Sequence, residues 1–268
     1  MHLQSHGLSC GIAGRTILSD VDLTVQRGRM VALVGVNGSG KSTLIRVLTG
    51  LRPPMAGSVT VDGTDLASLP ARKRATMLAH VGQEESPPED LLLGEMVAMG
   101  RIPHRPPWSV GRRSERRIVR DALDKVGLGH AIDRRCNQLS GGERRRAMLA
   151  RGIAQGSELL ILDEPTNHLD VHHQIQLLRT VRNLGQTVVA AMHDLPLATT
   201  YFDDIAVLHD GGLLTFDTAK NALTPATVEK VFSVDAAHLE HPATGQEHLV
   251  LGPGSTPTRA STPETTAS

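Results

Sequence analysis

The chain has 268 residues, of which 40 % are hydrophobic, 21 % charged and only 2 % aromatic, so we expect a globular core built from aliphatic side chains. Lysine plus arginine and aspartate plus glutamate balance at 28 each, which argues against a general attraction to nucleic acid or anionic lipid. Two distant cysteines indicate a reducing compartment, and no run approaches the roughly 18 apolar residues of a membrane span.

The first informative element is an apolar run at 30–34 that leads into the glycine-rich segment Gly35-Val-Asn-Gly-Ser-Gly-Lys-Ser42. Apolar residues at helical spacing follow, so this segment joins a strand to a helix. Glycines let backbone N–H groups turn toward a phosphate, Lys41 can reach the β- and γ-phosphates, and Ser42 can ligate Mg²⁺. A chance glycine turn is the alternative, and the eight-residue match disfavours it. The expected nucleotide ligands are Gly35, Val36, Asn37, Gly38, Ser39, Gly40, Lys41, Ser42 and Thr43.

Further strands are predicted at 78–82, 158–162, 187–192 and 205–209, where short apolar runs end at polar or turn residues. A helical pattern at 171–184 separates the second of these from the third. Strands that alternate with helices favour a parallel sheet flanked by helices.

The middle of the chain, about 84–156, has no strand pattern. Helical spacing at 91–99 and 115–126 predicts an α-helical subdomain there, inserted into the sheet domain. Residues 102–108 contain three prolines, which remove donors and fix φ, so this stretch is predicted not to be helical.

A short motif, Leu139-Ser-Gly-Gly-Glu143, precedes an arginine-rich helical run at 143–154. Ser140 is a good N-cap, and its hydroxyl together with the N–H groups of Gly141 and Gly142 can bind an anion. The motif has no function on a nucleotide bound by its own chain, whereas a second copy could present it to the far side of that nucleotide. A simple helix cap is the alternative, and both roles can hold together.

The strand predicted at 158–162 leads into two carboxylates, Asp163 and Glu164. The first can face Mg²⁺, directly or through water, and the second can orient or deprotonate an attacking water. Alone, the pattern also fits a buried strand with a solvated end. The phosphate-binding segment upstream favours the catalytic interpretation.

Two single residues complete this series: Gln83, after the strand at 78–82, and His193, after the strand at 187–192. In this order the motifs resemble the ATP-binding subunit of an ABC transporter, over about residues 3–251. The resemblance implies an α/β fold: a P-loop NTPase (ABC ATPase) core with a mainly parallel sheet, an antiparallel N-terminal β subdomain and the inserted α-helical subdomain.

The resemblance also implies one nucleotide-binding domain at 1–251, with the helical subdomain at about 84–156. Residues 252–268 are mainly Gly, Pro, Ser, Thr and Ala, which bury too little apolar area to fold, so they are predicted to form a disordered tail.

Residue functions follow from the same resemblance, with ATP and Mg²⁺ as the implied ligands. Glu164 is expected to be the catalytic base, His193 to contact the γ-phosphate, and Gln83 to contact the metal and the water. Asp170 is expected to form contacts across a dimer. The expected ligands of Mg²⁺ are Ser42, Gln83 and Asp163.

Three positions depart from the family pattern. Ile12 stands where relatives usually stack an aromatic ring on adenine, so the preference for ATP over GTP is less secure than hydrolysis. Gly82 replaces a frequent proline and suggests a looser hinge. Arg145 replaces a frequent glutamine, and we expect this change to matter little.

Four segments are similar to importers of iron–siderophore, haem and cobalamin complexes: 99–104, 164–170, 193–198 and 242–245. A ferric siderophore is the first expectation, with haem and cobalamin open. A soluble regulatory ATPase of the same fold and an unrelated phosphate-loop kinase or transferase are the alternatives. A regulatory ATPase of this kind usually has two nucleotide domains in one chain, and the 139–143 motif disfavours a kinase or transferase.

The implied partners are a second copy that completes an ATP sandwich, transmembrane permease subunits and, indirectly, an extracytoplasmic substrate-binding protein, with no nucleic acid. No basic segment followed by an apolar one opens the chain, so we expect no signal peptide. The resemblance implies a peripheral position on the cytoplasmic face of the membrane.

Coupling to the permease is predicted in the segment 84–108, after Gln83. A short permease helix is expected in a groove near Arg101 and Trp108. The alternative is packing within the helical subdomain. The apolar residues in question are Leu91, Leu92, Leu93, Met96 and Val97.

Overall fold

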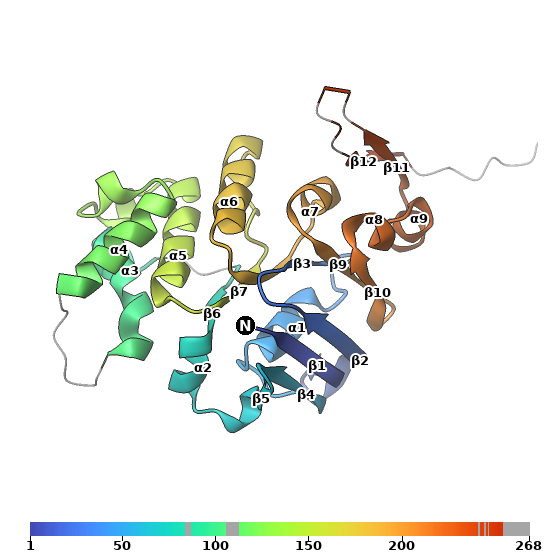
Figure 1. Cartoon of the computed structure of the whole chain (residues 1–268), viewed down its shortest axis with the longest axis horizontal. Helices are drawn as coiled ribbons and strands as arrows, with labels where there is room; N and C mark the ends of the chain where they lie inside the picture. The colour runs from blue at the N-terminus through green and yellow to red at the C-terminus, as the bar shows by residue number, and fades with distance from the viewer. Residues whose placement is uncertain (84–86, 106–112, 241, 244, 246, 254–268) are drawn as a thin grey trace, which may run out of the picture.

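The computed structural model describes residues 1–83, 87–105, 113–240, 242–243, 245 and 247–253. Its centre is a six-stranded sheet of order β10-β9-β3-β8-β7-β6, in which only the β9–β10 pair is antiparallel (Figure 1). The strands are β3 (Met30–Val34), β6 (Leu78–Val81), β7 (Leu159–Asp163), β8 (Thr187–Ala191), β9 (Asp204–His209) and β10 (Gly212–Thr218). The mainly parallel core is thereby confirmed.

A second, four-stranded antiparallel sheet of order β2-β1-β4-β5 confirms the N-terminal β subdomain. Its strands are β1 (Leu3–Ile12), β2 (Arg15–Val25), β4 (Ala56–Val61) and β5 (Thr64–Asp65). The hairpin of β11 (Asp235–Glu240) and β12 (Glu247–Gly252) lies at the opposite end of the molecule from α3–α5 in Figure 1.

The α-helices are α1 (Lys41–Leu48), α2 (Ala71–Met77), α3 (Leu93–Ala98), α4 (Arg113–Lys125), α5 (Gly141–Gln155), α6 (Val171–Asn183), α7 (Leu195–Tyr201), α8 (Ala219–Ala222) and α9 (Pro225–Phe232). Short 3₁₀ helices are η1 (Leu66–Ser68), η2 (Met99–His104), η3 (Gly129–Ala131) and η4 (Cys136–Gln138). Side-chain caps explain several starts, since Ser140, Asp170 and Asp194 each accept a hydrogen bond from the backbone three residues on. Within the described residues, no helix is both long and apolar enough to span a membrane.

The two faces of the central sheet are buried in different cores. Along β3, Met30, Ala32 and Val34 face the core shared with α5, α6 and α7, while Val31 and Leu33 face the core shared with α1 and the antiparallel sheet. Every residue of β3 is therefore buried, as expected for a central parallel strand. α1 packs between the two sheets, which fixes the loop that precedes it over the strand ends.

The described residues between β6 and β7 form helices and turns, with one isolated bridge, Leu92↔Arg135. One prediction here is wrong: 102–104 are helical, within η2. The fixed φ of Pro103 is close to that of a 3₁₀ helix, so its ring costs the helix only one hydrogen bond. Residues 106–108 lie outside the described part of the chain.

Element ends differ from the sequence prediction by one or two residues. The strand predicted at 158–162 runs one residue further, so Asp163 is its last member. The tail predicted at 252–268 overlaps β12 by one residue, and 254–268 lie outside the described residues. The division into a nucleotide-binding domain at 1–251 and a tail stays a prediction.

Candidate functional site

A cavity of about 220 Å³ lies where the glycine-rich segment meets the carboxyl ends of the central strands. Its lining residues are Ile12, Ile17, Asn37, Gly38, Gly40, Lys41, Ser42, Thr43, Glu164 and His193. β3, β7 and β8 are parallel neighbours, so the segments that leave their carboxyl ends meet at one edge of the sheet, where α/β proteins bind ligands.

The loop backbone needs glycine at two places. A Cβ on Gly35 would lie 2.6 Å from the Leu208 carbonyl oxygen, and one on Gly40, at φ +98°, would lie 2.9 Å from the side chains of Ile17 and Leu18. Gly40 caps α1 without a side-chain hydrogen bond, which leaves first-turn N–H groups for a ligand. Ser39 Oγ is buried without a hydrogen-bond partner among the described residues. These features fit a bound phosphate.

The Lys41 ammonium is buried beside this loop. Its Nζ donates to the carbonyl oxygens of Gly35, at 2.7 Å, and Val36, at 3.1 Å. Burial lowers the pKa of Lys41, and the carboxylates of Glu164 and Asp163 act in the opposite direction. Since carbonyls supply only partial charge, the buried ammonium favours an anion in the cavity.

Ser42 and Asp163 form a pair of oxygen donors at the floor of the site. Ser42 Oγ donates to Asp163 Oδ1 at 3.1 Å. Burial raises the pKa of Asp163, and the Ser42 hydrogen bond opposes that shift. Hard oxygen donors of this kind suit Mg²⁺, and a bound cation would favour the charged carboxylate, so the residues fit the predicted metal.

Both carboxylate oxygens of Glu164 have a partner. Oε1 contacts Nε2 of His193, and Oε2 accepts a 2.6 Å hydrogen bond from Asn167 Nδ2. Glu164 has φ +51°, a left-handed conformation that costs a non-glycine residue about 1–2 kcal/mol. A nearly buried carboxylate, fixed at the edge of the cavity, can orient or deprotonate a water there.

Ser140, Gly141 and Gly142 do not line this cavity. Ser140 caps α5: its Oγ accepts from the Glu143 N–H, and Glu143 Oε2 accepts from the Ser140 N–H at 2.8 Å. An ion pair with Arg134 is the main cause that lowers the pKa of Glu143 to about 2. The motif is thus a capped helix start with Ser140 exposed, outside the lining of the chain's own phosphate-loop cavity.

Gln83 and Asp170 also lie outside the cavity lining. Gln83 is exposed directly after β6, and its carbonyl oxygen accepts from Arg145 Nη1 at 3.1 Å. Asp170 caps α6 by accepting from the His173 N–H at 2.9 Å, and this bond lowers the pKa of Asp170. The geometry of the chain alone therefore gives these two residues no contact with the cavity.

Three residues of the site region were not selected from the sequence: Ile17, Asn167 and Arg145. Ile17 lies in β2 and reaches the cavity because β1 and β2 form a hairpin, a placement that the alternation of the hairpin could have suggested. Asn167 and Arg145 depend on the tertiary structure. Arg145 donates hydrogen bonds to the backbone carbonyls of five residues, although the sequence led us to expect only a minor effect of this arginine.

Three of the five apolar residues that were predicted to supply the permease groove are unavailable to a partner, whereas Leu91 and Leu92 are half-buried and Leu92 lines a cavity between α3 and α4. Leu93, Met96 and Val97 are fully buried in the core that α4 and α5 share, so packing within the helical segment explains them. The Arg101 guanidinium donates to carbonyls in the last turn of α5, at Ala154 and Gln155. Residues 84–86 and Trp108 lie outside the described residues.

Comparison with known proteins identifies a family and several relatives to which this chain is similar. Residues 18–167 match the family described as ABC transporter. The hemin import ATP-binding protein HmuV of Bordetella pertussis is 38 % identical over 94 % of this chain and 99 % of its own length. The iron(3+)-hydroxamate import ATP-binding protein FhuC of Bacillus subtilis is 32 % identical over 91 % of this chain and 92 % of its own length.

The cobalamin import ATP-binding protein BtuD of Halobacterium salinarum is 39 % identical over 98 % of this chain, which spans 66 % of that relative's length. Among solved structures, a metal-chelate type ABC transporter in an inward-facing conformation gives a TM-score of 0.80 at 24 % identity, over 93 % of this chain and 96 % of that one. The structural likeness supports the fold.

Proposed function

This chain belongs to the ABC transporter family, as an ABC ATPase cassette, and we propose that it is the ATP-hydrolysing subunit of a membrane importer. The observation that carries the proposal is the single cavity that holds Lys41, Ser42, Glu164 and His193, with Asp163 bonded to its floor. A phosphate cradle, a metal-binding pair and a fixed carboxylate are together what phosphoryl transfer to water requires.

Each side chain has a defined task in this proposal. Lys41 and the N–H groups of the loop bind the phosphates of ATP, and Ile12 with Ile17 covers one wall of the cavity. Ser42 and Asp163 would hold Mg²⁺, which would neutralise charge on the phosphates. Glu164 takes the proton of the attacking water, and His193 holds Glu164 in place while it contacts the γ-phosphate.

A second copy of the chain would complete the site. The capped start of α5, with Ser140 exposed, cannot serve the cavity of its own chain and is free to face a partner's nucleotide. In the same arrangement Asp170 contacts the partner, and Gln83 reaches the metal and the water when the helical segment moves.

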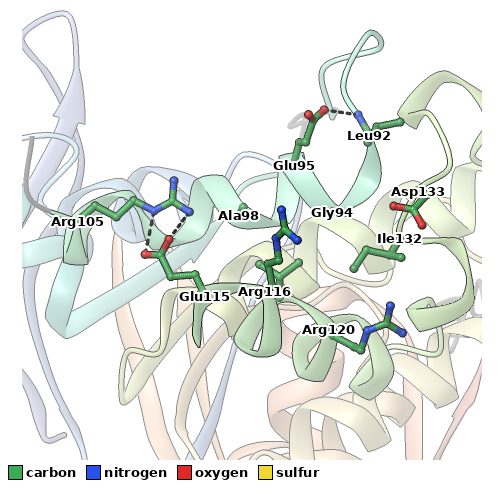
Figure 2. Close-up of a pocket in the computed structure, with 11 residues that line it drawn as sticks. Leu92, Gly94, Glu95, Ala98, Arg105, Glu115, Arg116, Arg120, Ile132 and Asp133 are labelled. Atoms are coloured by element: carbon green, nitrogen blue, oxygen red, sulfur yellow. Dashed lines mark hydrogen bonds and ion pairs between the residues drawn. The ribbon is translucent and has the colours of Figure 1, made fainter. Parts of the chain in front are cut away.

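The remaining partners are transmembrane permease subunits and, through them, an extracytoplasmic substrate-binding protein. The chain would then sit on the cytoplasmic face of the membrane. A cavity of about 750 Å³ between α3 and α4 is our candidate docking site for a short permease helix. Figure 2 shows residues from the two helices facing one another across it, with the Arg105–Glu115 ion pair at one end.

The cargo is proposed to be a metal complex, with a ferric siderophore to be tested first. The relatives named for cobalamin and hemin, at 39 % and 38 %, are more similar than the one named for iron(3+)-hydroxamate, at 32 %, so both are retained as alternatives. Uptake by the complete transporter, measured in parallel for the three cargoes, separates them.

The Glu164→Gln variant tests the hydrolysis proposal. It should bind ATP with Mg²⁺, lose nearly all turnover and accumulate as an ATP-bound dimer in size-exclusion chromatography. Lys41→Ala, which removes the ammonium from the cradle, is the matched control that should neither bind nor dimerise. A Glu164→Gln variant that stays monomeric with saturating ATP and Mg²⁺, also beside its permease, would refute the two-chain site.

A further inference from the structure

One arginine ties the start of α5 to the ends of two strands of the central sheet. Arg145 lies half-buried in the second turn of α5, two residues after the Ser140–Glu143 capping box. Its Nη1 donates to the carbonyl oxygens of Gly82, at 2.9 Å, and Gln83, at 3.1 Å, both directly after β6. These residues lie more than 60 positions away in the sequence.

The other two guanidinium nitrogens bind the end of β7. Nη2 donates to the carbonyls of Asp163, at 2.8 Å, and Glu164, at 2.7 Å, and Nε donates to that of Pro165, at 3.2 Å. A guanidinium carries five N–H donors in a planar, rigid fork, so one side chain can bind carbonyls at both strand ends. Arg145 therefore holds three successive carbonyls of β7's end and two of β6's end at once.

Four of the five carbonyls that Arg145 binds lie beyond the last ladder pairs, and the fifth is that of Asp163, the last paired residue of β7. The β6–β7 ladder has its last pair at Val81↔Leu162, and the β7–β8 ladder at Asp163↔Ala191. Glu164 follows with φ +51°, a conformation that must be held by its surroundings. Two of the bonded carbonyls flank Glu164, and one is its own, so the direction of the Glu164 carboxylate depends on this arginine.

We propose that Arg145 is a positioning residue: it fixes Glu164 and the Gln83 backbone to the helix whose N-terminus is offered to the partner copy. This inference rests on the proposed ATPase function. Engagement of the α5 start by a partner's nucleotide would then be transmitted, through one turn of helix, to the chain's own base. Hydrolysis would be tied to assembly of the two-chain site.

The chemistry of the fork makes the proposal specific to arginine. Methionine keeps much of the length and apolar stem but has no donor. Lysine keeps the charge but has three donors on a single nitrogen, which cannot reach carbonyls on both strands. Arg145→Met should therefore lower kcat for ATP by about 10- to 100-fold, the scale on which small misplacements of reacting groups act. The KM for ATP should change less than about threefold, because the phosphate cradle is intact.

The experiment uses the full chain at concentrations that populate the dimer, and compares wild type, Arg145→Met, Arg145→Lys and Arg101→Met. Arg101 is the matched control, since it also donates to carbonyls of α5 but at the opposite end of the helix. Each variant is first checked for ATP binding and thermal unfolding. Arg101→Met should keep wild-type kcat, and Arg145→Lys should recover less than half of it.

A double-variant cycle separates positioning from general support of the fold. If Arg145 acts through Glu164, Arg145→Met should cause little further loss in single-turnover hydrolysis when Glu164 is already Gln. The same fold-loss in both backgrounds, full recovery by Arg145→Lys, or wild-type kcat in Arg145→Met would each overturn the inference. Wild-type protein that binds but never hydrolyses ATP would instead refute the proposed function.

Discussion

The side-chain amide of Asn167 lies 2.6 Å from Oε2 of Glu164, the carboxylate oxygen that His193 does not contact. The two residues are also joined through the backbone, since the Asn167 N–H donates to the Glu164 carbonyl. The turn at 164–167 therefore holds the Glu164 carboxylate through a side chain of the same turn. Because both oxygens are held, rotation of the Glu164 side chain away from the cavity requires the loss of a contact on each side.

Removal of the amide should reduce turnover without affecting nucleotide binding. We expect Asn167→Ala to lower kcat by about tenfold, since one charge-assisted hydrogen bond that orients the base is lost, while the Kd for ATP stays within about twofold. Gln174→Ala is the control: this amide donates to the Thr166 carbonyl in the same region but does not contact Glu164. Steady-state kinetics and parallel binding measurements test whether Asn167 orients Glu164. Equal kcat values for the Asn167 and Gln174 variants would rule out this role.

Loss of the imidazole should have a related but larger effect. His193→Ala is expected to bind ATP and to hydrolyse it at least tenfold more slowly, because Glu164 Oε1 loses its partner and the γ-phosphate loses a donor. His209→Ala provides a comparison, as His209 ends β9, another strand of the central sheet, and does not line the cavity. Turnover at the wild-type rate in the His193 variant would remove this residue from the site.

Some residues of the site could be predicted from the sequence, because they belong to local patterns. In the glycine loop and in Asp163-Glu164, a short apolar strand is followed directly by the polar residues of the motif. Lys41, Ser42 and Glu164 could therefore be predicted from the sequence, and all three line one cavity, with Asp163 hydrogen-bonded to Ser42. Hydrophobic periodicity reports element type, and for these residues element type is sufficient to place them.

Contacts that depend on strand order could not be predicted in the same way. Arg145 meets Gly82 and Asp163 because β6 and β7 are neighbours, a pairing that no periodicity reveals. Likewise, the sequence alone assigned apolar residues at 91–97 to a permease groove. The helix is six residues long and packs against both α4 and α5, so Leu93 and Met96 are buried within the subdomain.

Acid should weaken the start of α5 through Glu143. The ion pair with Arg134 is the main cause that lowers the folded-state pKa of Glu143 from 4.5 to about 2. A depressed carboxyl pKa stabilises the fold above the unfolded value, and that contribution disappears as pH falls from about 4.5 toward 2. After allowance for solvent screening of this partly exposed pair, we expect about 1–2 kcal/mol.

Urea unfolding of Arg134→Met tests this assignment. At pH 7 the variant should be less stable than wild type by that amount, and the difference should shrink at pH 3, where Glu143 gains a proton on unfolding. Arg117→Met removes a more exposed pair, with Asp121, and should cost less than about 0.5 kcal/mol. A pH-independent difference for Arg134→Met would show that lost packing, rather than the ion pair, is responsible.

The cavity between α3 and α4 gives the coupling prediction a defined target. Its wall combines apolar residues with charges of both signs, which suits a short amphipathic helix. Arg101 does not test this surface, because it does not line the cavity and its guanidinium binds the last turn of α5 instead. Arg116, exposed on α4 and facing the cavity in Figure 2, is the better choice.

Arg116→Glu should abolish transport and the stimulation of ATPase activity by the permease, while nucleotide binding and basal turnover of the detached subunit stay at wild-type values. Arg117→Glu is the matched control: it makes the same charge change on the next residue of α4, which does not line the cavity, and should transport normally. A cysteine at Ala98, on the opposite wall, should form disulfides with cysteines placed in the cytoplasmic loops of the permease. Crosslinks that form only elsewhere, together with normal transport by Arg116→Glu, would exclude this cavity as the docking site and leave the ATPase assignment intact.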